Sequence, residues 1–131
     1  VQSLREQTYK NYEIIIVDDG SDDATPLICK DLEKAGYIDL FIRANSRGGK
    51  ASAANLGTFY AKGKYVVHLD ADSSLDRDAL ENILIPFYMD NQIKAVGGVG
   101  DGINLRGGCS NIGNRRYLPD GQNLPYLRAG V

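Results

Sequence analysis

The chain has 131 residues, a formal net charge of −2 and 43% hydrophobic residues. This length suffices for one compact domain, and the slightly acidic balance excludes a general nucleic-acid surface, which needs a basic stripe. No apolar run reaches the roughly 20 residues needed to cross a bilayer. The two cysteines, Cys29 and Cys109, stand alone in the sequence, so we expect reduced structural residues in a reducing compartment.

The first elements are a helix end and a strand. Residues 1–7 read as the tail of an amphipathic helix already under way, which predicts that the chain is a piece of a longer protein. Residues 13–17 form a β-branched run that ends in two aspartates, a glycine and a serine. A continuous apolar run bounded by turn residues is typical of a strand buried on both faces, as in a parallel sheet.

The next segment predicts an amphipathic helix. Thr25 suits the N-cap, Pro26 the first helical position and Gly36 the C-terminal cap. The expected inward face consists of Leu27, Ile28, Leu32 and Ala35.

The same alternation continues to about residue 100. Residues 40–43 predict a second strand, residues 50–61 an alanine-rich helix after a polar loop, and residues 64–69 a third strand that Asp70-Ala71-Asp72 closes. A helix is expected over about 77–88, with Pro86 bending or ending it, and its expected inward residues are Leu80, Ile83, Leu84 and Phe87.

The last third of the chain carries a weaker signal. Residues 95–99 predict a fourth strand, residues 101–113 are rich in glycine, and residues 115–130 read as loop with little core. Strands that alternate with helices of about 10 to 12 residues predict an α/β fold, with a parallel sheet and right-handed crossovers.

Acidic residues follow two of the predicted strands, where open parallel sheets bind ligands. Asp70 and Asp72 lie two positions apart, so on an extended segment their side chains point the same way and can converge on one divalent cation such as Mg²⁺ or Mn²⁺. The competing interpretation is a solvated turn with one aspartate capping the next helix. Asp76 and Asp78 are interpreted as first-turn helix residues.

Three further residues are candidates for binding a ligand. Asp18 and Asp19 are either ordinary turn residues or acceptors for hydrogen bonds from a base or ribose. Lys50 opens a helix after two glycines, where its ammonium and nearby backbone N–H groups suit a phosphate, although a solvated lysine fits as well. His68, the single histidine, is interpreted as a packed strand residue.

Four motifs in order resemble family 2 glycosyltransferases over roughly residues 3 to 100. The segment 14–23 resembles the family's first nucleotide-binding motif, and segment 3–13 its preceding helix. Segment 49–57 is similar to that of membrane-bound, often processive members, which include synthases of hyaluronan, chitin, cellulose and poly-N-acetylglucosamine. Segment 61–73 is similar to the family's metal motif.

This resemblance implies a GT-A fold and a sugar transfer from a nucleotide donor, commonly a UDP-sugar, to a hydroxyl acceptor, usually with inversion. Asp18, alone or together with Asp19, would contact the base, and Lys50 the diphosphate. Asp70 would lie by the ribose and metal, and Asp72 would ligate Mn²⁺ or Mg²⁺. The implied location is cytoplasmic, at a membrane face reached through segments outside this chain.

Departures from the family pattern limit what this chain is expected to do alone. The opening strand of the family is missing, and no residue is assignable as the catalytic base, for which Asp120 is a poor candidate. We expect a single partial domain, with residues 1–100 as the nucleotide-sugar-binding half and residues 101–131 as the start of the acceptor side. Donor binding is expected to survive without catalysis.

Two other classes of protein remain as alternatives. A response-regulator receiver domain also has acidic residues after two strands and a bound Mg²⁺, but it needs a lysine after a late apolar strand, and residues 96–99 offer none. A non-catalytic remnant of the fold would bind partners only, with no affinity for nucleotide or metal.

Overall fold

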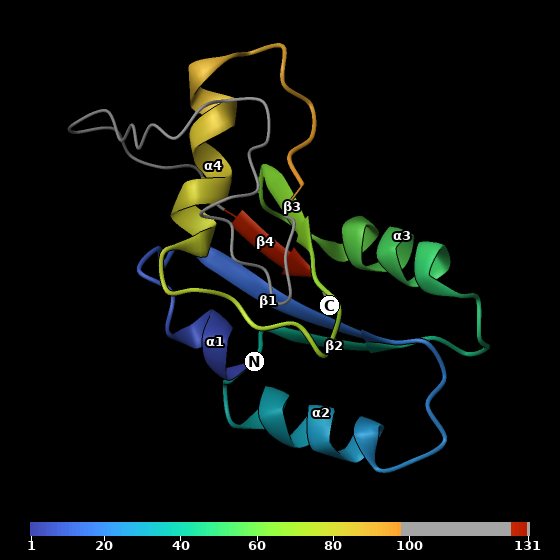
Figure 1. Cartoon of the computed structure of the whole chain (residues 1–131). Helices are drawn as coiled ribbons and strands as arrows, with labels where there is room; N and C mark the ends of the chain where they lie inside the picture. The colour runs from blue at the N-terminus through green and yellow to red at the C-terminus, as the bar shows by residue number, and fades with distance from the viewer. Residues whose placement is uncertain (98–126, 131) are drawn as a thin grey trace. The chain divides into compact units, whose positions relative to one another are not determined.

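The computed structural model describes residues 1–97 and 127–130, and the chain divides into two compact units (Figure 1). The sheet unit comprises Asn11–Ala71 and Leu124–Val131. The helical unit comprises Val1–Lys10 and Asp72–Asn123.

The sheet unit is built on four parallel strands. They are β1 (Tyr12–Asp18), β2 (Leu40–Arg43), β3 (Tyr65–His68) and β4 (Leu127–Gly130), in the spatial order β2-β1-β4-β3. Three of these strands were expected from the sequence, and the α/β prediction with a parallel sheet is confirmed.

The strand β1 forms the core of this unit. Ile14 and Ile15 are only 3% and 1% exposed, and successive side chains of a strand point to opposite faces. Both faces of β1 are therefore covered, as the apolar run predicted. Glu13 is also buried, and its Oε1 accepts a hydrogen bond from the backbone N–H of Lys62 at 2.7 Å.

Two helices cover the sheet. The helix α2 (Thr25–Lys34) packs on β2 and β1, and α3 (Lys50–Tyr60) packs on β1 and β4. The chain moves outward from β1 to β2 and then back across β1 to β3, so right-handed crossovers place the two helices on opposite faces (Figure 1). Gly57 allows a close approach, since a Cβ there would lie 3.2 Å from Cγ2 of Val17.

The inward face predicted for α2 is partly wrong. Leu27 and Ile28 are 67% and 57% exposed, whereas Pro26 and Cys29 are buried. Residues three apart share one helix face, so the face set by Pro26 and Cys29 turns the intervening pair outward. Of the other expected residues, Leu32 is half-buried and Ala35 is exposed.

The two ends of α2 were predicted with different success. Thr25 is the first helical residue, not the N-cap: Ala24 occupies the N-cap, and Asp23 Oδ1 accepts the Thr25 N–H at 2.8 Å. Gly36 caps the other end as predicted, with a φ of 70°. The N–H groups of Gly36 and Tyr37 reach back to the carbonyls of Glu33 and Leu32, at 3.0 and 2.9 Å, which is the Schellman pattern.

The helical unit is organised around Gln7, which is fully buried. Its Nε2 donates to the carbonyls of Ser3 and Asp76, at 2.9 and 2.7 Å, and its Oε1 accepts the N–H of Leu80 at 3.0 Å. One amide side chain thereby joins the segment after α1 (Gln2–Arg5) to the start of α4 (Ala79–Met89). The helical character expected for residues 1–7 is confirmed over Gln2–Arg5, and that it is the tail of a longer helix stays a prediction.

The helix α4 follows its prediction except at its ends. Leu80 and Leu84 are buried as expected, while Ile83 and Phe87 are half-buried. The helix does not end at Pro86 but continues to Met89. Proline removes one intrahelical donor, and the turn beyond it still closes, because the Asp90 N–H donates to the Pro86 carbonyl at 3.1 Å.

The fourth strand was misplaced by the sequence analysis. Residues 95–97 are not a strand, and residues 98–99 lie outside the described part of the chain. The strand is instead Leu127–Gly130, within a stretch predicted to be loop, and it fills the position between β1 and β3. A short parallel strand gains its stability from two neighbours far away in sequence, which a local pattern does not reveal.

Candidate functional site at the carboxyl ends of the strands

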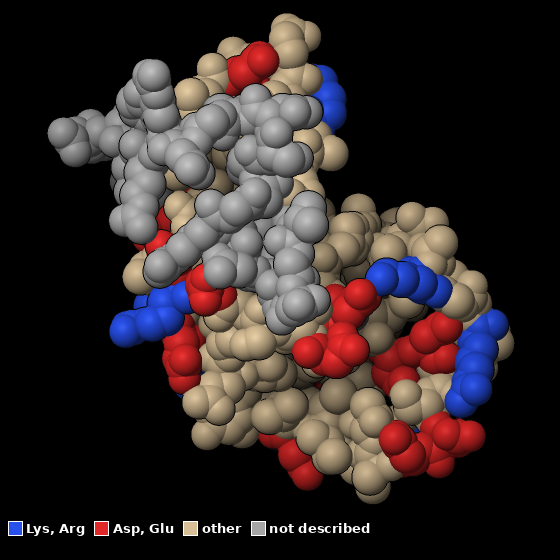
Figure 2. All heavy atoms as spheres, viewed as in Figure 1, with Lys and Arg blue, Asp and Glu red and all other residues tan. Residues whose placement is uncertain are grey.

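Charged side chains collect where the parallel strands of the sheet unit end. β1 ends at Asp18 and β2 at Arg43, Asp70 follows β3 by two residues, and Lys50 opens α3. Figure 2 shows acidic and basic side chains lying close to one another in the part of the view that holds the loops after β1 and β2. This edge is the one at which parallel sheets bind ligands.

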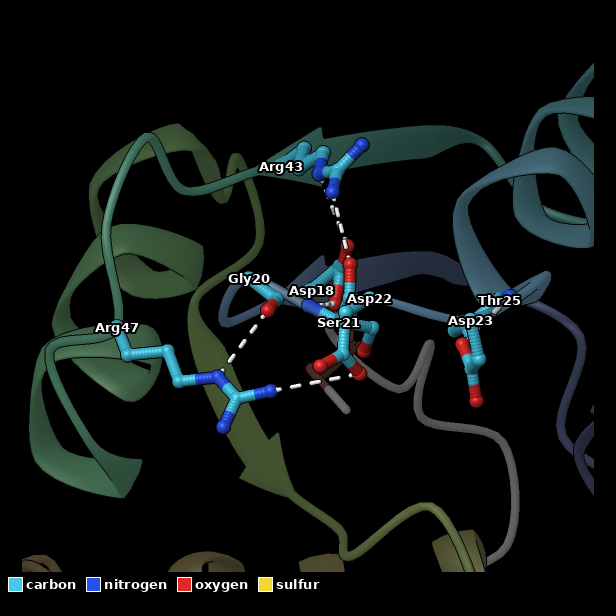
Figure 3. A network of polar contacts seen from close by, with 8 residues as sticks. All are labelled: Asp18, Gly20, Ser21, Asp22, Asp23, Thr25, Arg43 and Arg47. Carbon is cyan, nitrogen blue, oxygen red and sulfur yellow. Dashed lines mark hydrogen bonds and ion pairs between the residues drawn. The ribbon is translucent and has the colours of Figure 1, made fainter.

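Asp18 is buried and held in place by its own chain. Its Oδ1 accepts the Ser21 N–H at 2.9 Å, and its Oδ2 lies 3.4 Å from Nε of Arg43. The strand register places Arg43 directly beside Asp18, and the guanidinium also donates to the Ser21 carbonyl at 2.8 Å (Figure 3). The end of β1 is therefore a fixed structure that involves β2.

The buried carboxylate influences its surroundings. Asp18 is 4% exposed, and its Oδ2 has the Arg43 ion pair but no hydrogen bond. Burial raises the pKa of the nearby Cys29 thiol, and the charge of Asp18 raises it further. Cys29 is buried and free, in agreement with a reduced structural cysteine, while Cys109 lies outside the described residues.

Asp19 binds the loop that precedes α3. Its Oδ1 accepts the N–H of Gly48 and its Oδ2 the N–H of Gly49, both at 2.8 Å. Gly49 is the N-cap of α3 and has a φ of 80°. The predicted site residues Asp19 and Lys50 are thus connected through two residues of backbone.

Lys50 and Asp70 form an exposed ion pair. The Nζ atom lies 2.6 Å from Oδ1 and 2.9 Å from Oδ2 of Asp70, and the two side chains are 81% and 58% exposed. The structure therefore brings two of the predicted site residues into direct contact. An ammonium on both oxygens of an exposed carboxylate is a contact that a ligand or cation can displace at small cost.

Arg47 was not identified from the sequence. Its Nε donates to the Gly20 carbonyl at 3.2 Å, and its guanidinium lies 3.6 Å from Asp22 (Figure 3). An open depression of about 440 Å³ lies here, lined by Gly20, Arg43, Ala44, Asn45, Ser46 and Arg47. A polar depression beside a buried carboxylate suits a hydrogen-bonding ligand.

Arg43 was also missed, although the sequence carried a signal for it. An arginine that ends an apolar strand lies beside the residue that ends the neighbouring parallel strand, here Asp18. Arg47 had no comparable signal, because its contacts depend on the path of a loop.

The remaining candidates belong to other elements or lie outside the described residues. Asp72 is exposed and belongs to the helical unit, where Asp78 is the N-cap of α4 and Asp76 precedes it. His68 lies in β3 with an exposed side chain, so it is not packed as expected. Within residues 1–97 and 127–130, no three His, Cys, Asp or Glu side chains gather closely enough to hold a metal ion. Asp120 lies outside that part.

A comparison with protein families shows to which family the chain belongs. The family model described as "Glycosyl transferase family 2" matches residues 1–119. The chain belongs to this family. The match covers all four motifs, and it sets the receiver-domain alternative aside.

Curated relatives of the chain are named for glycan chemistry. It is 36% identical over 83 residues to glycosyltransferase GlyA of Streptococcus pneumoniae, covering 63% of this chain and 12% of that protein. It is 33% identical over 86 residues to the minor teichoic acid biosynthesis protein GgaB of Bacillus subtilis, covering 64% and 10%. It is 41% identical over 91 residues to the poly-beta-1,6-N-acetyl-D-glucosamine synthase of Staphylococcus aureus, covering 69% and 22%.

These relatives are much longer than the region that matches. The chain spans between about a tenth and a quarter of each of the three proteins. No solved structure matched the chain. Among the described residues, no helix combines the length and apolar character that a membrane span requires.

Proposed function

We propose that this chain carries the donor-binding part of a glycosyltransferase that moves a sugar from a nucleoside diphosphate to a hydroxyl acceptor in glycan or polysaccharide synthesis. The observation that carries the proposal is the family match over residues 1–119. The gathering of Asp18, Asp19, Lys50 and Asp70 around the carboxyl ends of parallel strands supports it.

The proposed donor is a UDP-sugar. Lys50 contributes a positive charge that attracts a diphosphate, because its ammonium is exposed and bound only to an exposed carboxylate within the described residues. The polar depression beside Asp18 and Arg43 has the hydrogen-bonding character that a base or ribose needs. The proposed acceptor is a glycan or another hydroxyl compound, as the names of the relatives suggest.

A divalent cation, Mn²⁺ or Mg²⁺, fits the chemistry of the donor set. Asp70 offers two exposed carboxylate oxygens, the ligand type that these hard cations prefer, and Asp72 adds a second exposed carboxylate two residues later. Such a cation keeps open positions for phosphate oxygens and neutralises charge on the diphosphate leaving group. We propose Asp70 and Asp72 as its protein ligands.

The proposal includes inversion at the anomeric carbon and a cytoplasmic location at a membrane face. Both follow from the resemblance to the membrane-bound members. An acceptor hydroxyl needs a positioned base to lose its proton, and we assign that role to no residue of this chain.

Calorimetric titration of UDP tests the donor site, with Mn²⁺ or with a chelator, on the full-length protein and its Asp72→Ala variant. We expect binding that depends on the metal and is lost in the variant. The matched control is Asp31→Ala, which removes an exposed carboxylate on α2. A folded protein that binds no UDP under any of these conditions would favour the non-catalytic remnant.

A further inference from the structure

We propose that Asp19 is a positioning residue that fixes the start of α3, and with it Lys50, for the donor diphosphate, and that it is not a ligand of the nucleotide base. The inference rests on the proposed function and names how that site is held together. It starts from the two hydrogen bonds of 2.8 Å that the Asp19 carboxylate accepts from the Gly48 and Gly49 N–H groups.

One of these two N–H groups, that of the N-cap Gly49, lies where a helix needs an acceptor, and that of Gly48 lies one residue before it. The first N–H groups of a helix have no intrahelical partner, and the N-cap of α3, Gly49, has no side chain with which to cap it. Asp19, about 30 residues earlier in the chain, supplies the missing acceptor. A negative charge is also favourable at this end of the helix dipole.

The same contact limits how the helix start can be used. Consecutive backbone N–H groups at a helix N-terminus are a common phosphate site, but here a carboxylate occupies the N–H of the N-cap Gly49 and that of Gly48 before it. The formal positive charge at the start of α3 is the ammonium of Lys50, its first residue. Asp19 fixes the backbone from which that ammonium extends, and the exposed Asp70 carboxylate holds the ammonium until a ligand or cation replaces it.

The loop sequence suits this arrangement. Gly49 has a φ of 80°, which other residues rarely adopt. A Cβ on Gly48 would lie 2.5 Å from Oγ of Ser52, so a side chain there would force the loop away from the helix. The two glycines allow consecutive N–H groups to face one carboxylate, which explains their place beside Lys50.

Amide hydrogen exchange measures the contact without any ligand. In the full-length protein, Asp19→Ala is expected to raise the exchange rates of the Gly48 and Gly49 amides about tenfold or more, because both lose a charge-assisted hydrogen bond. Asp19→Asn keeps the size of the side chain and one acceptor, so its rates should lie between. Asp31→Ala, which removes an exposed carboxylate on α2, is the control for charge and should leave them unchanged. Unchanged rates in Asp19→Ala would overturn the inference.

Binding of uridine and UDP separates positioning from base contact. If Asp19 acts through Lys50, then Asp19→Ala weakens UDP binding about tenfold and leaves uridine binding as it was. Lys50→Gln should show the same pattern, and the double variant should lose little more than either single one. Asp19→Asn should retain part of the UDP affinity. Equal losses for uridine and UDP in Asp19→Ala would mean that Asp19 contacts the base and would contradict the inference.

The two proposals fail in different ways. A wild-type protein that binds neither uridine nor UDP contradicts the proposed function, whatever the exchange rates are. A wild-type protein that binds UDP more tightly than uridine, with losses in Asp19→Ala and Lys50→Gln that simply add, supports the proposed function and overturns the positioning role.

Discussion

Two carboxylates of the sheet unit follow parallel strands but lie in opposite environments. At the end of β1, the Asp18 side chain is 2% exposed and is held by the Ser21 N–H and by Arg43. After β3, the Asp70 side chain is 58% exposed and contacts the ammonium of Lys50, which is itself 81% exposed. The first carboxylate is part of the scaffold, and the second is open to exchange its partner.

The physical reason lies in solvation. Removing one member of a buried pair leaves an uncompensated charge away from water, which is costly. Exposed pairs contribute little, because water and salt screen both charges. A binding site needs both kinds of group, one that keeps its geometry and one that releases its contact when a ligand arrives.

Arg43→Ala is expected to have the largest effect on stability. It leaves the buried Asp18 carboxylate with the Ser21 N–H but without its counter-charge. Because the Arg43 side chain is itself 52% exposed, the free energy of unfolding should fall by about 1 to 2 kcal/mol. Denaturant titration measures this change. Arg47→Ala is the matched control, since its partner Asp22 is 92% exposed, and it should cost at most about 0.5 kcal/mol. Equal effects of the two variants would show that Asp18 is not the fixed carboxylate described here.

Gly48→Ala should have a similar or slightly smaller effect on stability. It perturbs the loop whose Gly48 N–H donates to Asp19. The added methyl group would meet Ser52 at 2.5 Å, so the loop must move, and overpacking of this kind costs about 1 to 2 kcal/mol. Thermal unfolding measures the loss. In a Ser52→Gly background the obstacle is gone, and the same substitution should cost clearly less. A cost that does not depend on Ser52 would place the strain elsewhere.

The helices and strands around these carboxylates were predicted from the sequence better than the contacts between them. The continuous β-branched run before Asp18 predicts a strand and the alanine-rich segment after Lys50 predicts a helix, and both elements are confirmed. The strand at 127–130 was missed because its stability comes from β1 and β3 and not from its own residues. The outward turn of Leu27 and Ile28 shows the same limit for a helix face.

The candidate site shows a similar division. Residue type and position after a strand identified Asp18, Asp19, Lys50 and Asp70, and the structure brings Lys50 and Asp70 into contact. The partners of the first two, Arg43 and the Gly48–Gly49 amides, depend on strand register and loop path, which the sequence did not specify. The metal, the donor and the roles of these residues stay predictions.

Lys50→Gln should change stability very little. An exposed ion pair is worth at most about 0.5 to 1 kcal/mol, so the free energy of unfolding should shift by about 0.5 kcal/mol or less. Denaturant titration in low and high salt provides the measurement, and salt should reduce even this shift. A loss as large as that of Arg43→Ala would show that Asp70 is fixed in the same way as Asp18.

The Cys29 thiol should give the smallest change in stability, and this change should appear only at alkaline pH. Burial and the charge of Asp18 raise the pKa of its thiol in the folded protein, so above the thiol's ordinary pKa the unfolded state binds fewer protons than the folded state. Stability is then fully present below that pKa and declines as the pH rises through it. Unfolding titrations from pH 7 to 10, in a Cys109→Ser background, measure the decline. Asp18→Asn should reduce it, and a stability that rises with pH would contradict the assignment.

Paramagnetic broadening by Mn²⁺ in the presence of UDP tests the comparison most directly. The measurement is an amide spectrum of the full-length protein at low Mn²⁺, with the signals of the sheet unit assigned. The account predicts that amides flanking Asp70 broaden first, that those flanking Asp18 and Asp19 broaden later, and that Asp70→Asn removes the early broadening. Broadening that begins around Asp18 and Asp19, and persists in Asp70→Asn, would show that the buried end of β1 and not the open end of β3 receives the metal.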